Sequence, residues 1–338
     1  MHILITGGAG FIGSHLVELH LAQGDKVHVV DDLSTGSMDN VTGFLDHPNY
    51  RFDHADILTW PQLERTANWA NRIYHLAAVV GVYRVLADPT KVLAINIAAC
   101  ERLLRAVQVS GWKPQVVLAS SSEVYGHNDE DLLRETQDLV ISTRVGTRWN
   151  YSVSKIADEA LGMSFAKKFG IPTVIVRFFN TVGPRQSARY GMVIPRFVER
   201  AVQDETIEVF GNGNQTRSFC DVRDTVAALN LLATHANTEG LVVNVGNDRE
   251  ISINNLARLI IQRAESQSGI IHVPYREAYG EDFEDIRRRR PALDRLRGLT
   301  GFQHCFTLEQ TIDDLIAAQR AKNLESEYGD GTVVRHQP

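Results

Sequence analysis

The sequence predicts an α/β protein with a doubly wound parallel sheet and a smaller C-terminal lobe. Short runs rich in Val and Ile alternate with longer helical stretches through the first half of the chain. These runs are apolar throughout, as burial on both faces of a parallel sheet requires. A glycine-rich turn follows the first run directly. Strand, helix and strand repeated in this way place helices on both faces of one sheet.

Three helices and five strands account for this pattern in the first half of the chain. Residues 11–22, 89–109 and 149–169 predict helices, because their apolar residues recur at helical spacing. A glycine follows each of them, and glycine readily takes the left-handed conformation that ends a helix. The predicted strands are the apolar runs at residues 3–6, 27–31, 72–75, 116–120 and 173–178.

The chain changes character near residue 180, where elements become shorter and are broken by glycine, proline and asparagine. We therefore expect residues 1–180 to form the sheet domain and residues 181–322 to form mainly the smaller lobe. The apolar run at residues 242–245 predicts a strand that returns to the sheet. Residues 323–338 are polar and predict a flexible tail.

The composition excludes several classes of function. The 338 residues include 35 Lys and Arg against 41 Asp and Glu, and the formal charge of −6 rules out a nucleic-acid binder held by bulk basic charge. No apolar run approaches the ~18 residues of a membrane span, and the first residues lack a signal-peptide pattern. Cys100, Cys220 and Cys305 are far apart and form no CxxC pair. We expect a cytoplasmic protein that binds no metal and no membrane.

A dinucleotide site is predicted at the turn after the first strand. Gly8, Gly10 and Gly13 satisfy the pattern GxGxxG, in which glycines allow a tight turn and a close approach of the backbone to a pyrophosphate. The following helix begins there, and its first N–H groups and dipole attract phosphates. The residues expected to bind the cofactor at this turn are Gly7, Gly10, Phe11, Ile12 and Gly13.

The second predicted strand ends at Asp31, where a carboxylate accepts hydrogen bonds from an adenosine ribose. The same charge repels a 2′-phosphate, so the sequence favours NAD over NADP. Two further segments follow the next strands of the sheet. We expect Asp56 and Ile57 to flank the adenine, and Leu76, Ala77 and Ala78 to line the path of the cofactor.

An acid–base pair is predicted at the start of the helix over residues 149–169. Tyr151 and Lys155 are four residues apart, so they project from one helix face. An ammonium beside a phenol stabilises the phenolate and lowers a pKa that starts at ~10. Tyr151 can then take a proton from an alcohol while a hydride passes to NAD. The serines at residues 120–122 end a strand at the ligand-binding edge of the sheet, where a hydroxyl can bind the reacting oxygen.

These motifs, with RFFNTVGPR at residues 177–185 and GNGNQTRSF at residues 211–219, resemble the extended short-chain dehydrogenase/reductase superfamily. The similarity is to its nucleotide-sugar epimerases, dehydratases and decarboxylases, and it spans residues 1 to about 320 in unbroken order. The resemblance implies tightly bound NAD that is recycled as an oxidant. It also implies a UDP- or dTDP-sugar held in the C-terminal lobe and a transient oxidation at sugar C4.

The resemblance also implies roles for individual residues. Ser121, Tyr151 and Lys155 match the family's catalytic triad, and Lys155 also lies at the cofactor. Asn180 matches a substrate-contacting asparagine, and Arg217 matches an arginine near the nucleotide diphosphate. Asn96 matches an asparagine that supports the site. The helices over residues 89–109 and 149–169 resemble those that form a four-helix homodimer interface, although their apolar faces can also pack within one subunit.

The residues after Ser121 bear on which reaction follows C4 oxidation. The 4,6-dehydratases that the chain resembles have Asp-Glu there, whereas this chain has Ser122-Glu123 and lacks that acid. Ordinary 4-epimerases need no acid or base at C5, so Glu123 would be surplus in an epimerase; its alternative role is a hydrogen-bonding support for the loop. The pattern Ser-Ser-Glu-Val-Tyr-Gly and the pair Arg148-Trp149 look most like UDP-glucuronate decarboxylases. We place Ser122 and Glu123 among the catalytic candidates.

An arginine run at residues 287–290 precedes Pro291, and Arg289 stands where the decarboxylases carry an arginine. A cation near sugar C6 would recognise a carboxylate. The run can instead form a solvated basic face, or an ion-pair patch with Glu281, Asp282, Glu284 and Asp285. Three functions stay open: UDP-glucuronate decarboxylation as the preferred one, 4-epimerisation of a UDP-hexose or UDP-hexuronate, and a non-catalytic dinucleotide-binding protein.

Overall fold

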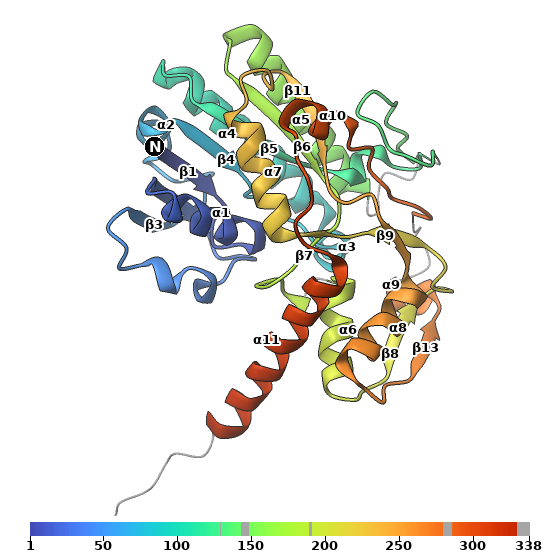
Figure 1. Ribbon diagram of the computed structural model, residues 1–338. Helices are drawn as coiled ribbons and strands as arrows, with labels where there is room; N and C mark the ends of the chain where they lie inside the picture. The colour runs from blue at the N-terminus through green and yellow to red at the C-terminus, as the bar shows by residue number, and fades with distance from the viewer. Residues whose placement is uncertain (129, 143–148, 189–190, 280–285, 330–338) are drawn as a thin grey trace, which may run out of the picture.

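The computed structural model describes residues 1–128, 130–142, 149–188, 191–279 and 286–329. Seven parallel strands form one sheet in the order β11-β6-β5-β4-β1-β2-β3 (Figure 1). The order reverses at β1, so the doubly wound prediction is confirmed. The strands are β1 (His2–Thr6), β2 (Lys26–Asp31), β3 (Tyr50–His54), β4 (Arg72–His75), β5 (Gln115–Ser121), β6 (Thr173–Phe178) and β11 (Leu241–Val245).

Successive side chains of the central strands enter two different cores, which explains why the strands are apolar without alternation. Ile3 and Ile5 of β1 pack on one face of the sheet, whereas Leu4 packs on the other. Val117 and Leu118 of β5 divide in the same way. Parallel pairing in register carries this arrangement from strand to strand.

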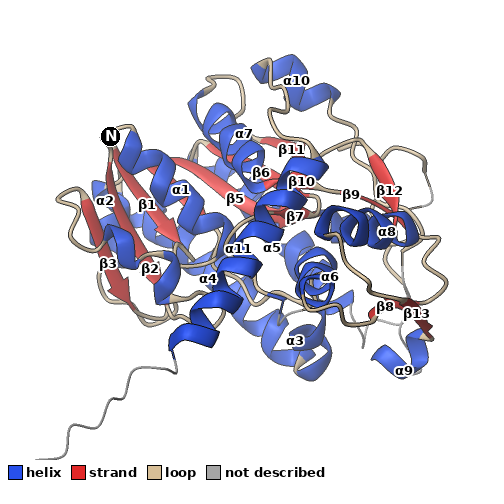
Figure 2. Cartoon of the chain, turned by 60° about the horizontal axis from the view of Figure 1, so that its bottom comes forward, coloured by secondary structure: helices blue, strands red, loops and turns tan. Residues whose placement is uncertain are grey.

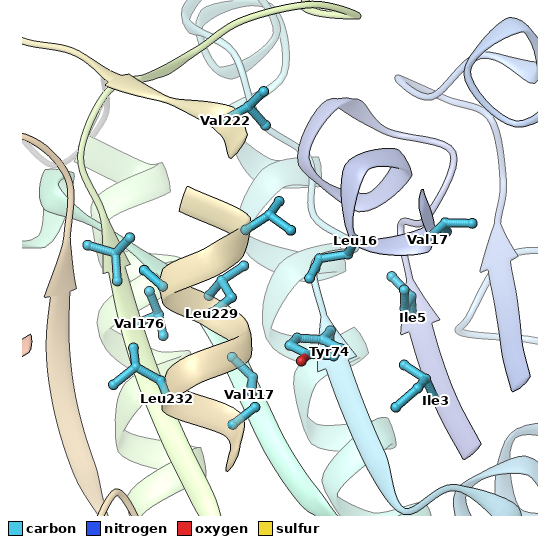
Figure 3. Packing of buried hydrophobic residues seen from close by; sticks show 14 of the residues in the cluster. Ile3, Ile5, Leu16, Val17, Tyr74, Val117, Val176, Val222, Leu229 and Leu232 are labelled. Carbon is cyan, nitrogen blue, oxygen red and sulfur yellow. The ribbon is translucent and has the colours of Figure 1, made fainter. Parts of the chain in front are cut away.

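Helices cover both faces of the sheet (Figure 2). The first core lies under α1 (Phe11–Ala22), α7 (Val222–Thr234) and α10 (Asp294–Thr300). Figure 3 shows Leu229 and Leu232 of α7 packed toward Val117 and Val176 of the sheet. The second core lies under α2 (Leu63–Trp69), α4 (Pro89–Ser110) and α5 (Trp149–Phe169). The long predicted helices therefore have the expected positions, and each ends at its glycine.

The lobe that follows β6 has its own hydrophobic core. It combines α6 (Val193–Val202), α8 (Ile253–Ala264) and α11 (Leu308–Gly329) with the parallel pair β8 (Ile207–Phe210) and β13 (Ile270–Val273). The remaining elements are short. They are η1 (Met38–Asn40), η2 (Thr42–Phe44), α3 (Val82–Ala87), η3 (Ser122–Tyr125), β7 (Thr181–Val182), β9 (Thr216–Ser218), β10 (Cys220–Asp221), β12 (Glu250–Ser252) and α9 (Tyr275–Tyr279).

The lobe and the sheet domain interleave along the chain. β11 pairs with β6 at the edge of the large sheet, where the sequence placed a returning strand, and α7 and α10 also pack on this sheet. α11 continues to Gly329 and extends away from the rest of the molecule in Figure 1. Residues 323–329 of the predicted tail are thus helical, and their flexibility stays a prediction. Residues 330–338 lie outside the described ranges. In those ranges no helix has the length and apolar character needed to cross a membrane.

Candidate active site

In the glycine turn between β1 and α1, side chains at Gly7 and Gly13 would collide with neighbouring backbone atoms. Because these positions have no side chains, a ligand can approach the backbone of the turn closely. Gly7 has a φ of +74°, and a Cβ there would lie 2.8 Å from the backbone nitrogen of Ala77. A Cβ on Gly13 would collide with the Gly7 carbonyl oxygen. The first amides of α1, those of Phe11, Ile12 and Gly13, have no intrahelical acceptor. This cradle fits the pyrophosphate of a dinucleotide.

Asp31 joins the end of β2 to the glycine turn. Its carboxylate accepts hydrogen bonds from the Ala9 amide at 2.9 Å and from the Leu33 amide at 2.8 Å. Burial raises the pKa of Asp31, and these two amides oppose the rise. Each carboxylate oxygen has a further lone pair, which suits the ribose hydroxyls predicted from the sequence.

The end of β4 forms a buried part of the same region. Thr6 Oγ1 lies 2.8 Å from His75 Nδ1 and accepts a hydrogen bond from the Ala77 amide at 3.2 Å. Burial, assisted by the charge of Lys155, lowers the pKa of His75 to about 3, so its ring is neutral. The predicted cofactor-lining residues Leu76, Ala77 and Ala78 follow directly and are partly exposed.

The third predicted cofactor segment divides between surface and core. Asp56 is exposed and binds the Leu58 amide at 2.9 Å. Ile57 is buried in the core under α2 and α4. Their predicted positions after β3 are correct, and their contact with adenine stays a prediction.

Tyr151 and Lys155 lie on α5 beside the end of β5. The Tyr151 phenol and the Ser121 hydroxyl form a side-chain hydrogen bond, and Ser121 Oγ also accepts from the Glu123 amide at 3.2 Å. Burial raises the pKa of Tyr151 above its usual value, and the Lys155 ammonium opposes this rise. Lys155 acts to lower the pKa of Tyr151, as the sequence predicts. The predicted net lowering of this pKa is wrong in this structure, because burial raises it by more than Lys155 lowers it.

Lys155 is buried and its ammonium has two acceptors. Nζ donates to the Ala119 carbonyl of β5 at 3.0 Å and to Asp158 Oδ2 at 3.0 Å. Burial alone disfavours the ammonium, but Asp158 and Tyr151 together raise the pKa of Lys155. Lys155 is therefore charged over the physiological range.

Asn96 of α4 supports the start of α5, as the resemblance implies. Its amide donates to Ser154 Oγ at 3.1 Å, and Ser154 Oγ donates to the Tyr151 carbonyl at 2.8 Å. Its other bonds, at 2.7 and 3.2 Å, hold the backbone of Val79 after β4. Asn96 thereby ties the β4 loop to the helix that carries Tyr151 and Lys155.

The two residues that bear on the reaction lie together. Arg289 Nη2 forms a 2.7 Å ion pair with Glu123 Oε1, although 166 residues separate them in the sequence. Arg289 is 6% exposed, and its Nε has no hydrogen-bond partner among the described residues. The alternative of a solvated basic face is therefore wrong for Arg289. Its predicted acidic partners at residues 281–285 lie outside the described ranges, as does Arg148.

Short backbone pairings hold the segment that carries Arg289. The Leu133 amide donates to the Arg290 carbonyl at 2.9 Å, and the Ala292 amide donates to the Leu133 carbonyl at 2.9 Å. The buried Asn244 of β11 donates to the Leu133 carbonyl at 2.8 Å and to the Ala292 carbonyl at 3.2 Å. The edge of the large sheet therefore fixes the arginine segment.

The predicted substrate residues lie next to this segment. Asn180 Nδ2 donates to the Ser218 carbonyl at 3.3 Å, and Ser218 Oγ donates to the Arg289 carbonyl at 3.3 Å. Arg217 precedes Ser218 in β9 and donates to the Thr216 carbonyl at 2.8 Å. Ser122 is buried at the start of η3, while Ser121 and Glu123 on either side are partly exposed.

Comparison with known proteins decides the family. Residues 3–246 match the model of the NAD dependent epimerase/dehydratase family. The chain belongs to this family. It is thus an NAD-dependent protein of the extended short-chain dehydrogenase/reductase type, and the resemblance drawn from the sequence is confirmed. Among its relatives are enzymes that modify UDP-sugars.

Several relatives of the chain have names that include decarboxylase. The chain is 34% identical over 317 residues to a UDP-N-acetyl-alpha-D-glucosaminuronate decarboxylase of Bacillus cytotoxicus, covering 93% of this chain and 96% of that protein. It is 32% identical to UDP-glucuronic acid decarboxylase 1 of Xenopus tropicalis, covering 99% and 76%. A solved UDP-glucose 4-epimerase of Thermotoga maritima superposes with a TM-score of 0.84 at 28% identity, covering 96% of this chain and all of that one.

Sequence reasoning missed a group of buried charges beside the triad. Glu159 forms a two-point ion pair with Arg177 at 2.8 and 2.7 Å, and Ser120 Oγ donates to it at 2.5 Å. Asp158 binds Lys155, as described above. The available signal was the spacing, since Asp158 is one helical turn from Lys155.

Proposed function

We propose that this protein decarboxylates a UDP-hexuronate, with UDP-glucuronate as the first substrate to test, through transient oxidation at sugar C4. The observation that carries the proposal is the buried Arg289–Glu123 ion pair next to Ser121. A guanidinium recognises a carboxylate with a pair of parallel N–H donors. Arg289 Nε is buried and has no described partner, so the guanidinium keeps a donor that Glu123 does not use.

The names of the two decarboxylase relatives support the same choice. Both act, by name, on nucleotide sugars that carry a carboxylate at the hexose C6. Glu123 already pairs with Arg289, and a neutral hexose would bring no second charge for the guanidinium to bind. The arginine therefore serves orientation of an anion better than it serves binding of a hydroxymethyl group.

Oxidation at C4 is assigned to the residues around Tyr151. When bound, NAD supplies the hydride acceptor and later the hydride donor. Tyr151 takes the proton of the C4 hydroxyl, and Ser121 binds the same oxygen. Lys155 stabilises the phenolate by its charge. A hydride and a proton leave together, so C4 becomes a ketone.

The ketone makes the sugar a β-keto acid, and the next bond to break joins C5 and C6. Arg289 orients the carboxylate so that the C5–C6 electron pair passes toward the C4 carbonyl as carbon dioxide leaves. Glu123 shares the charge of Arg289, which orients the carboxylate without stabilising it fully before it reacts. A proton from solvent then adds to C5, and the return of a hydride to C4 and of the Tyr151 proton to the oxygen completes the cycle.

The test is incubation of the purified protein with UDP-glucuronate, UDP-N-acetylglucosaminuronate or UDP-glucose, followed by mass spectrometry and sugar NMR. The proposal expects one of the two uronates to lose the mass of carbon dioxide and to give a UDP-pentose. Reaction of UDP-glucose alone would contradict it.

The second candidate is C4 epimerisation, and the similarity to the solved UDP-glucose 4-epimerase favours it. The same triad would serve, since an epimerase returns the hydride to the opposite face of C4. An unchanged mass with inverted C4 would establish this function. A non-catalytic dinucleotide-binding protein is disfavoured because Tyr151 and Lys155 are both present.

We also propose that the protein is cytoplasmic, that the domain of residues 1–180 binds NAD, and that residues 181–322 bind most of the nucleotide sugar.

We further propose that the protein is a homodimer through α4 and α5. The support for the dimer is the apolar face of α4 that Leu93, Ala94, Ile97 and Ala98 leave partly or fully exposed. Leu93→Glu should convert a particle of twice 37.7 kDa into one of 37.7 kDa in light scattering. A wild-type monomer at micromolar concentration would contradict the dimer. Thr90 and Glu101 flank this face.

A further inference from the structure

The carboxylate of Asp158 has no role in the mechanism above, yet it touches the catalytic lysine. It lies three residues after Lys155 on α5 and is 3% exposed. Oδ2 accepts from Lys155 Nζ at 3.0 Å, and Oδ1 has no hydrogen-bond partner in the described part of the chain. A buried ion pair contributes little net stability, because desolvation offsets most of the attraction. Asp158 offsets the burial of the Lys155 charge, so a role toward Tyr151 has to be tested by a readout that stability does not move.

Lys155 is held from two sides. The Ala119 carbonyl fixes the ammonium against β5, and Asp158 fixes it along α5. An ammonium has three N–H groups, so these bonds leave one for the reacting side of the site. The arrangement follows the logic of a catalytic triad, in which a third group orients and electrostatically supports the residue that assists the base.

The groups around Lys155 come from several elements, and only some of them are charged. Burial keeps the Cys100 thiol of α4 protonated and the His75 ring of β4 neutral. The charge of Glu159 is paired with Arg177, and that of Glu123 with Arg289. Asp158 is therefore the carboxylate that directly balances the Lys155 ammonium.

We propose that Asp158 is a positioning residue of this site, which holds the Lys155 ammonium in place and shares its charge, and thereby sets the pH range over which Tyr151 exchanges its proton. The inference rests on the proposed roles of Tyr151 and Lys155. Asp158 touches neither reacting atom and acts through the lysine. The raised pKa of Tyr151 is consistent with this, since burial is its main cause and the negative charge of Asp158 adds to it.

Removing the charge should move the activity profile toward acid. Asp158→Asn removes a negative charge that raises the pKa of Tyr151, so at every pH where Lys155 stays protonated the Tyr151 phenolate forms more readily, and its transition moves to lower pH. We expect the acidic limb of the kcat/KM profile to shift down by about one pH unit, with KM for the nucleotide sugar and NAD content unchanged. Asp158→Glu, which keeps the charge, should restore a profile close to that of the wild type.

The experiment uses the purified NAD-containing protein and whichever UDP-sugar it turns over. Asp158→Ala is a second neutral variant in case Asn does not fold. Asp224→Asn is the matched control, because Asp224 is also buried but binds the amides of Cys305 and Phe306 in another part of the molecule. It should lose stability and keep the wild-type pH profile.

A second readout does not depend on turnover. Ultraviolet titration of tyrosinate, with Tyr151→Phe subtracted in each background, should show the Tyr151 transition at lower pH in Asp158→Asn than in the wild type. Unchanged profiles and an unchanged transition in both neutral variants would overturn the proposal. Full turnover by Tyr151→Phe would instead overturn the proposed function, so the two failures are distinguishable.

Discussion

The two halves of the site are built differently. The cofactor half lies at the strand ends of one sheet, and the regular parallel topology brings its residues together, as for Thr6 with His75 and Gly7 with Ala77. The substrate half joins segments that are distant in the sequence. Its central contact is the ion pair between Glu123 and Arg289, and short backbone hydrogen bonds between loops hold the segment that carries Arg289. In the proposed function, the regular half carries the C4 oxidation and the loop-built half selects the reaction that follows.

The largest expected effect tests the regular half. Tyr151→Phe should lower kcat by roughly 10³-fold, because the general acid–base group is lost. The NAD content of the purified protein should stay the same, since the ring still packs in place. Steady-state kinetics and cofactor release on denaturation measure both quantities. A variant with wild-type kcat would remove Tyr151 from the chemistry.

The next effect tests the loop-built half. Arg289→Lys keeps the charge but loses the two-point donor, so kcat/KM for UDP-glucuronate should fall about 100-fold. Arg288→Lys is the matched control, because Arg288 is more exposed and pairs with Glu250 instead. Equal effects of the two variants would show that Arg289 has no special contact with the substrate.

The buried part of the cofactor half should also be sensitive to acid. His75 has a pKa of about 3 in the folded protein and 6.5 in the unfolded chain, so the unfolded state binds more protons between these values. The buried neutral ring of His75 therefore contributes fully to the unfolding free energy above pH 6.5, and this contribution is lost as the pH falls toward 3. From pH 7 to about pH 5 the wild type should lose about 2 kcal/mol more unfolding free energy than His75→Asn. Urea unfolding of both proteins checks this, and parallel pH dependences would contradict the buried neutral ring.

The smallest expected effect concerns the cofactor ribose. Asp31→Asn should weaken NAD binding about tenfold, since a charge-assisted hydrogen bond contributes ~1.5–3 kcal/mol and part of it is kept by the amide. The preference for NAD over NADP should shrink with it. Calorimetric titration of both cofactors measures the ratio. An unchanged ratio would mean that Asp31 only braces the turn through Ala9 and Leu33.

The sequence predicted the regular half well because its signals are local. The glycine turn, Asp31 at a strand end and the four-residue spacing of Tyr151 and Lys155 each follow from neighbouring residues. The pairing of Glu123 with Arg289 depends on how separate loops meet, and only the family resemblance pointed to Arg289. The sequence also does not show which side chains are buried. For this reason the predicted direction of the Tyr151 pKa shift is wrong, and the role of Asp158 was missed. At the C-terminus, polar composition did not show that α11 continues to Gly329.

The most direct test of the central claim is NMR of the product formed from UDP-glucuronate in heavy water. Oxidation at C4 followed by decarboxylation predicts loss of carbon dioxide, one deuterium at C5, and the original hydrogen retained at C4, because the hydride leaves and returns within the site. A six-carbon product with inverted C4 and no deuterium would contradict decarboxylation. Deuterium at C4 would contradict the closed hydride cycle.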